Sequence, residues 1–158
     1  MLRFPRQLQR YDSAADCCDR LAQRLETHLR QWLSMPLALR RPLGLATGRT
    51  MEPLYAALVQ RLMLWSAADL DELRQRWSSF NLDEYLGLPA GDPRRYSTYM
   101  SRHLGEPLQL PPETLHLPSG GAADAHGAAQ AYAAELNACG GVGVQLLGLG
   151  NNGHVGFN

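Results

Sequence analysis

The chain has 158 residues, of which 45% are hydrophobic, and this is enough to bury the core of one ordinary domain. Its 15 basic residues balance 15 acidic residues, which argues against a nucleic-acid partner, and no stretch is long and apolar enough for a signal peptide or a membrane span. Three cysteines without a disulfide or zinc spacing favour a reducing compartment, so we expect a cytoplasmic protein.

The first predicted element is an amphipathic helix that begins near Ser13 and ends before Pro36. A short apolar strand at 43–46 follows, and a second helix at 51–62 has Pro53 early, where its missing N–H is tolerated. The first helix is predicted from apolar positions at helical spacing, namely Cys18, Leu21, Ala22, Leu25, Leu29 and Trp32.

The second half of the chain continues to alternate strands with helices. A polar segment leads to a predicted strand at 76–81, a short helix at 92–105 that Gly105 closes, and a strand at 113–117. An alanine-rich helix at 124–138 precedes an apolar run at 142–149 that predicts a buried strand. This alternation predicts a single α/β domain over 1–158, with a parallel sheet covered by helices on both faces.

Three of these strands end in polar residues. The first runs into Thr47-Gly-Arg-Thr50 at a helix N-terminus, where free N–H groups favour an anion and Arg49 adds a planar cation. The second delivers Asp83 and Glu84, and the last delivers Asn151, Asn152 and His154. Each feature also has an ordinary structural interpretation: capping threonines, solvated acids, and an exposed histidine in a tight turn.

The three features make more sense together than separately. Ligands of open α/β sheets bind outside the carboxyl ends of the strands. An anion anchor, a carboxylate and a histidine at that edge would suit proton transfer on a small phosphorylated substrate. The chain contains no lysine, so no lysine can form a Schiff base or bind phosphate.

Three segments resemble the signatures of the glucosamine-6-phosphate deaminase (isomerase) family, in its order and roughly its spacing. They are 44–50, 80–88 and 148–158, that is GLATGRT, FNLDEYLGL and GLGNNGHVGFN. In related 6-phosphogluconolactonases an arginine typically follows the Asp-Glu pair and the Phe-Asn ending is absent. Tyr85 and Phe157-Asn158 therefore favour the amino-sugar branch.

The resemblance implies a Rossmann-like open parallel sheet and conversion of glucosamine 6-phosphate to fructose 6-phosphate and ammonia, without cofactor or metal. It assigns Asp83 as the base that moves a proton between C2 and C1, His154 as the acid/base that opens the sugar ring, and Asn152 as its orienting partner. It also implies that substrate and its phosphate are contacted by Thr47, Gly48, Arg49, Thr50, Glu84 and Gly150.

In the family, the sequence after Phe-Asn continues with a glutamate that partners the histidine, and with further phosphate-binding residues. We therefore expect this chain to carry the N-terminal part of the family domain, and activity of these 158 residues alone does not follow. Three alternatives stay open: a galactosamine-6-phosphate deaminase, a 6-phosphogluconolactonase-like hydrolase, and a non-catalytic sugar-phosphate sensor. A homo-oligomer also stays open.

Overall fold

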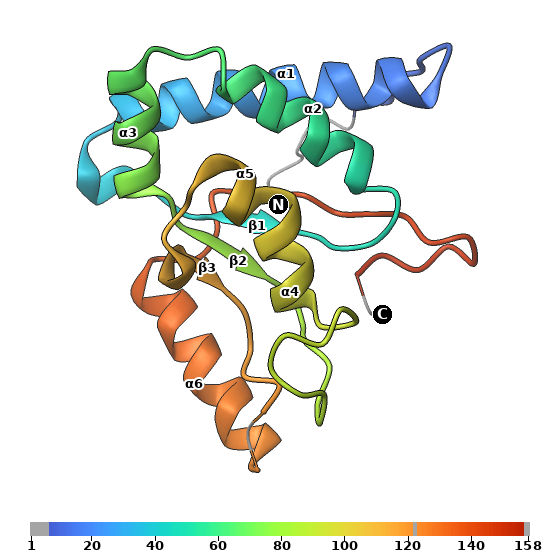
Figure 1. The fold of residues 1–158 in the computed structure, drawn as a ribbon, viewed down its shortest axis with the longest axis vertical. Helices are drawn as coiled ribbons and strands as arrows, with labels where there is room; N and C mark the ends of the chain where they lie inside the picture. The colour runs from blue at the N-terminus through green and yellow to red at the C-terminus, as the bar shows by residue number, and fades with distance from the viewer. Residues whose placement is uncertain (1–6, 122, 157–158) are drawn as a thin grey trace, which may run out of the picture.

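The computed structural model describes residues 7–121 and 123–156, which form a four-stranded parallel sheet flanked by helices (Figure 1). The strands are β1 (Leu43–Leu45), β2 (Ser79–Asn81), β3 (Leu115–His116) and β4 (Val144–Gln145). Their order across the sheet is β3-β2-β1-β4, with Gly44 of β1 in register with Phe80 on one side and Gln145 on the other. The two central strands are buried throughout, as expected for parallel strands.

One face of the sheet is covered by the helices that hold the core. These are α1 (Ala14–Ser34), α2 (Glu52–Leu62), α3 (Ala67–Arg76) and one continuous helical stretch made of α4 (Tyr96–Met100), the π-helical segment η2 (Ser101–Gly105) and α5 (Glu106–Leu108). Their apolar side chains pack onto β1 and one another, and fully buried members include Tyr55, Leu58, Leu73, Met100 and Leu104. Short 3-10 turns lie at Leu37–Leu39 (η1) and Pro112–Thr114 (η3).

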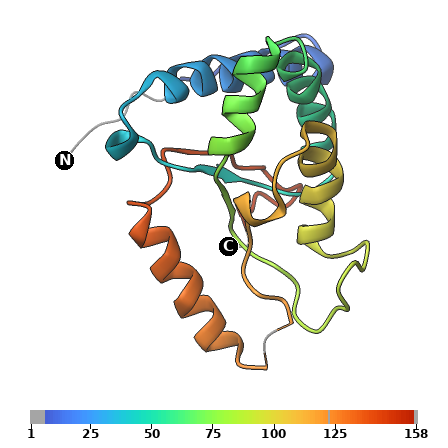
Figure 2. The ribbon, with the colours of Figure 1, turned by 60° about the vertical axis from the view of Figure 1, so that its left-hand side comes forward.

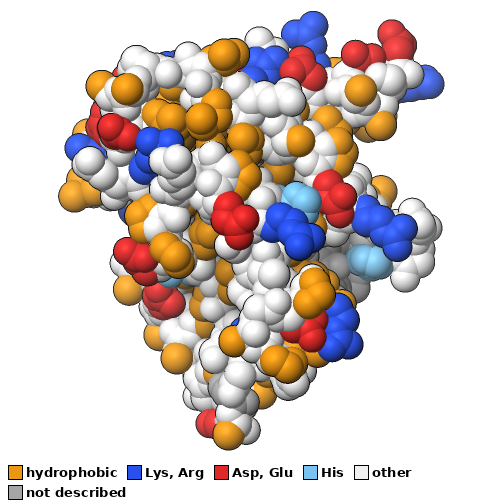
Figure 3. All heavy atoms as spheres, in the orientation of Figure 1, with side chains coloured by type: hydrophobic (Ala, Val, Ile, Leu, Met, Phe, Trp, Pro, Cys, Tyr) orange, Lys and Arg blue, Asp and Glu red, His pale blue; other side chains and the backbone are white. Residues whose placement is uncertain are grey.

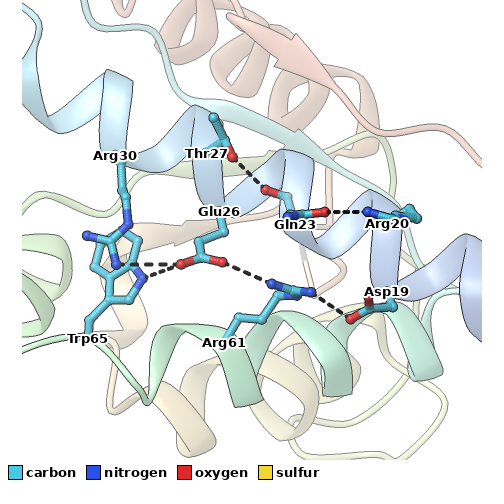
Figure 4. A network of polar contacts seen from close by, with 8 residues as sticks. All are labelled: Asp19, Arg20, Gln23, Glu26, Thr27, Arg30, Arg61 and Trp65. Atoms are coloured by element: carbon cyan, nitrogen blue, oxygen red, sulfur yellow. Dashed lines mark hydrogen bonds and ion pairs between the residues drawn. The ribbon is translucent and has the colours of Figure 1, made fainter.

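A polar network ties α1 to α2 along the solvent side of their contact (Figure 4). The Glu26 carboxylate accepts a hydrogen bond from the Trp65 indole at 2.9 Å and pairs with Arg61 at 3.4 Å, and Arg61 also pairs with Asp19 at 2.8 Å. Two carboxylates, one guanidinium and an indole N–H thus pair with one another within the layer that covers the sheet.

Helix α6 (Ala125–Ala138) lies on the opposite face of the sheet from α1, α2 and α3 (Figure 2). None of its residues is buried, and the Tyr132 hydroxyl anchors it by donating to the carbonyls of Asn81 at 2.7 Å and His116 at 3.0 Å. His116 also stacks on Phe80 and pairs with Glu135 at 2.6 Å. This face is therefore covered far more thinly than the other.

The predicted α/β class and parallel sheet are confirmed, as is the helix start at Ser13, whose side chain accepts from the Asp16 amide. Several boundaries were wrong. The helix expected from Asp92 begins at Tyr96, and of the strand expected at 113–117 only Leu115 and His116 form β3, because Pro112–Thr114 make the 3-10 turn η3. The polar segment before β2 is helix α3, which Ser66 caps, so the strand starts at Ser79 and not at Arg76. The helix does not close at Gly105 but runs on to Leu108, and Gln109 ends it in a left-handed conformation.

The expectation of a buried strand at 142–149 was also wrong in part. Only Val144 and Gln145 pair with β1, and Leu146 is buried, whereas Leu147 is 47% and Leu149 is 72% exposed. Among the described strands β4 is an edge of the sheet, so its apolar side chains lack neighbours on one side. Hydrophobicity alone did not reveal that position.

The surface drawn in Figure 3 carries acidic and basic side chains interspersed with apolar ones. Among the described residues, no helix combines the length and the apolar character needed to cross a membrane.

Candidate active site

The loops that follow β1, β2 and β4 meet at the carboxyl edge of the sheet, on the right in Figure 1. They surround a cavity of about 270 Å³. Asp83 and His154 both line it, although 71 positions of sequence separate them, and so do Thr47, Gly48 and Thr50. The parallel topology therefore brings together the carboxylate, the histidine and the predicted anion loop.

The anion loop leads directly into helix α2. Gly48 has a positive φ of 112°, its carbonyl accepts from the Met51 amide at 2.9 Å, and the Tyr99 hydroxyl donates to the same carbonyl at 2.9 Å. The loop is thus held from two sides with its backbone at the cavity wall, where the N-terminal end of α2 favours negative charge. Arg49 does not line this cavity but a neighbouring one of about 640 Å³, beside Tyr85 and Arg94.

Asp83 comes two residues after β2 and is half-buried. Its pKa is raised above the ordinary value, first because burial disfavours the charged carboxylate and second because the negative charge of Glu84 lies nearby. A carboxylate with a raised pKa is a stronger base, and Asp83 faces the cavity where a substrate C–H could lie.

Glu84 is not brought to the cavity with Asp83. Its side chain is 1% exposed, and its oxygens accept from the amides of Tyr96 at 2.8 Å and Ser97 at 2.9 Å, at the start of α4. Burial opposes ionisation, but these amide hydrogen bonds outweigh it and lower the pKa of Glu84. Glu84 therefore does not line this cavity, and the contact with substrate expected from the sequence stays a prediction.

His154 lies in a small hairpin in which Leu149 pairs with Val155. The Gly150 amide donates to the His154 carbonyl at 2.8 Å, and Gly150 also lines the cavity. The imidazole Nδ1 contacts the side-chain amide oxygen of Asn152, so Asn152 reaches the cavity only through the histidine. This is the arrangement of a histidine whose ring is oriented by a neighbouring amide.

Tyr96 lines the cavity and was missed by the sequence analysis. It starts α4, twelve residues after Glu84, and its hydroxyl lies 3.3 Å from the Tyr85 hydroxyl. Burial, together with Tyr85 and Asp83, raises its pKa, so it stays protonated and can donate a hydrogen bond. Tyr96 does not directly follow a strand, so the search for polar residues at the carboxyl ends of strands gave no signal for it.

Within residues 7–121 and 123–156, no three His, Cys, Asp or Glu side chains lie close enough together to hold a metal ion. Phe157 and Asn158, which favoured the amino-sugar branch in the sequence, lie outside the described residues.

The comparisons with known proteins agree with this geometry. Over 116 residues, or 73% of this chain, it is 42% identical to a glucosamine-6-phosphate deaminase of Shouchella clausii and 44% identical to one of Pseudarthrobacter chlorophenolicus. It covers 45% and 42% of those proteins, so the chain spans about half the length of the curated relatives it matches.

A solved structure of a monomeric glucosamine-6-phosphate deaminase superposes with a TM-score of 0.78 at 28% identity, over 93% of this chain and 56% of that one. The family model of glucosamine-6-phosphate isomerases/6-phosphogluconolactonase matches residues 12–156. The match takes in the anion loop, Asp83 and His154. The chain therefore belongs to the family of glucosamine-6-phosphate isomerases and 6-phosphogluconolactonases.

Proposed function

We propose that this chain carries part of the active site of an enzyme that converts glucosamine 6-phosphate and water to fructose 6-phosphate and ammonia. The observation that carries the proposal is the shared cavity, in which Asp83 and His154 lie beside the Thr47–Thr50 loop. The choice of this reaction is supported by the relatives that are named glucosamine-6-phosphate deaminases.

The cavity offers a group for each step of that reaction. The amides and hydroxyls of the Thr47–Thr50 loop hold the phosphate. Nε2 of His154 takes the proton from the anomeric hydroxyl and gives it to the ring oxygen, which opens the pyranose to an aldehyde at C1. Asp83 then takes the proton from C2 and delivers it to C1, while a proton of the amino group moves to O1, which leaves an imine at C2. Water hydrolyses that imine, so the nitrogen leaves as ammonia and a ketone remains.

Asn152 contributes through the imidazole. Its side-chain oxygen contacts Nδ1 of His154, which favours the tautomer with a proton on Nδ1 and leaves Nε2 to exchange a proton with the ring oxygen. None of the proposed steps, from ring opening to imine hydrolysis, uses a cofactor or a metal. A cytoplasmic location remains a prediction from the sequence, and whether the protein forms a homo-oligomer stays open.

The first test is binding to the chain itself. Isothermal titration with glucosamine 6-phosphate should give saturable binding that free glucosamine does not reproduce, because the loop recognises phosphate. Asp83→Asn should leave that binding within about twofold, since the proposed base does not hold the phosphate. Equal binding of glucosamine and its 6-phosphate would contradict the proposal.

The second test is turnover. Because the chain spans about half of its relatives, the assay uses a chimera of residues 12–156 with the remaining half of the Shouchella clausii deaminase. Ammonia release is measured with glucosamine 6-phosphate and with galactosamine 6-phosphate, and ring hydrolysis is measured with 6-phosphogluconolactone. These three assays separate the three enzymatic alternatives. His154→Gln should lose turnover on the ring form and recover part of it on substrate supplied in open-chain form. Binding without turnover in an otherwise folded chimera would favour the sensor.

A further inference from the structure

The feature that the proposed reaction does not use is the buried carboxylate of Glu84. It is next to the proposed base, it is almost inaccessible to solvent, and its oxygens accept three backbone N–H groups, those of Tyr85, Tyr96 and Ser97. Arg95 lies 3.5 Å from the same carboxylate. An ionised acid in such a place is retained because the amides replace the water that it has lost.

The chain is built to receive this side chain. A Cβ on Gly120 would lie 2.8 Å from Cγ of Glu84 and 2.4 Å from the Tyr85 carbonyl, so only glycine leaves room there. The Gly120 carbonyl in turn accepts from the Gly87 amide at 2.9 Å, which closes the loop after β2 onto the segment after β3. The carboxylate thus joins three segments that are distant in sequence.

We propose that Glu84 is a positioning residue: its carboxylate fixes the first turn of α4 against the loop after β2, and so holds Asp83 and Tyr96 in place at the cavity wall. Asp83 is its direct neighbour in the chain, and Tyr96 supplies one of the bound amides. Because both residues line the cavity, a loosened anchor would displace the base and the phenol together. The catalytic consequence rests on the proposed function, but the anchoring does not.

The same charge acts on Asp83 through space. The titratable groups that face Asp83 are Glu84 on its own loop, Tyr96 of α4, Tyr132 of α6 and His154 across the cavity. Of these Glu84 is the one whose charge is held ionised by amide hydrogen bonds, and it supports the raised pKa of Asp83. Substitution of Glu84 should therefore change the pKa of Asp83 as well as the positions of Asp83 and Tyr96.

Two substitutions separate the two effects. Glu84→Gln keeps the length of the side chain and removes its charge, so the Ser97 amide loses its acceptor and the pKa of Asp83 falls. Glu84→Asp keeps the charge but is one methylene shorter, so both α4 amides lose contact while the pKa of Asp83 stays raised. Asp124→Asn is the matched control, because Asp124 also accepts from a helix amide, that of Gly127 at 3.0 Å.

The readouts are NMR titration of the Asp83 carboxyl carbon and hydrogen exchange of the Tyr96 and Ser97 amides in the 158-residue protein. The hydrogen-exchange rate of the Ser97 amide should rise about tenfold in both variants, because the loss of one hydrogen bond to a charged acceptor changes the opening equilibrium by about that factor. In the chimera, kcat should fall with KM little changed. Unchanged exchange in both variants, or equal changes in Asp124→Asn, would overturn the proposal.

The unmodified protein supplies a measurement that holds even if a variant does not fold. The Glu84 carboxyl should itself titrate below its ordinary pKa, and a pKa at or above that value would overturn the anchor. If the amide and titration results hold while the chimera releases no ammonia, the anchor stands and the proposed function fails.

Discussion

Gly150→Ala tests how closely the backbone must approach His154, the residue proposed to open the sugar ring. A Cβ at Gly150 would lie 2.2 Å from Cε1, 2.5 Å from Nδ1 and 2.6 Å from Nε2 of His154, well inside the 3.4 Å of an ordinary contact. The imidazole must therefore move by about 1 Å, and a displacement of that size costs on the order of 100-fold in rate, or about 2.7 kcal/mol of transition-state stabilisation. Because His154 is exposed, the ring can swing away and stability should change by less than about 0.5 kcal/mol.

The assay compares kcat/KM of the chimera with and without Gly150→Ala, beside thermal unfolding of the 158-residue chain. Gly121→Ala is the matched control, because a Cβ there has no neighbour within 4 Å among the described residues and the glycine has no positive φ. Open-chain substrate should restore much of the lost rate if ring opening is the step affected. A Gly150→Ala chimera that turns over as fast as its parent would refute the assigned role of His154.

Three further outcomes follow from burial and charge. The folded-state pKa of Asp83 lies above its unfolded value, so folding favours the protonated form and this stabilisation is lost as the pH rises. Asp83→Asn should therefore raise Tm at about pH 7, and the gain should vanish at acid pH. The same variant should abolish turnover of the chimera. Glu26→Ala should cost about 1–3 kcal/mol in denaturant unfolding, because it leaves the Trp65 indole without its acceptor and Arg61 with one carboxylate in place of two. Asp19→Ala, at a 58% exposed side chain, should cost less than about 1 kcal/mol. Leu58→Ala should cost about 2–5 kcal/mol at a fully buried position and Leu64→Ala, at one 86% exposed, less than about 0.5 kcal/mol.

The sequence predicted the parts of the site that depend on strand order alone. Asp83 and His154 each follow a strand, and parallel strands deliver their carboxyl ends to one edge, so their meeting needed no knowledge of side-chain packing. Helix α3 was not predicted because most of its residues are polar and exposed, and only Leu70 and Leu73 are buried. The extent of β4 could not be predicted either, because an apolar run does not reveal whether a strand has a neighbour on both sides.

The two adjacent acids show where such prediction stops. From sequence, Asp83 and Glu84 form one acidic pair at a strand end, and both were expected at the substrate. In the structure their pKa values shift in opposite directions, because Asp83 is half-buried at the cavity beside a negative charge while Glu84 is bound by amides of α4. That difference depends on a helix whose first residues lie twelve and thirteen positions further along the chain. A carboxylate that is bound by backbone amides remains ionised beside the proposed base, and its negative charge raises the pKa of that base. The two acids therefore differ in protonation because of tertiary structure and not because of residue type.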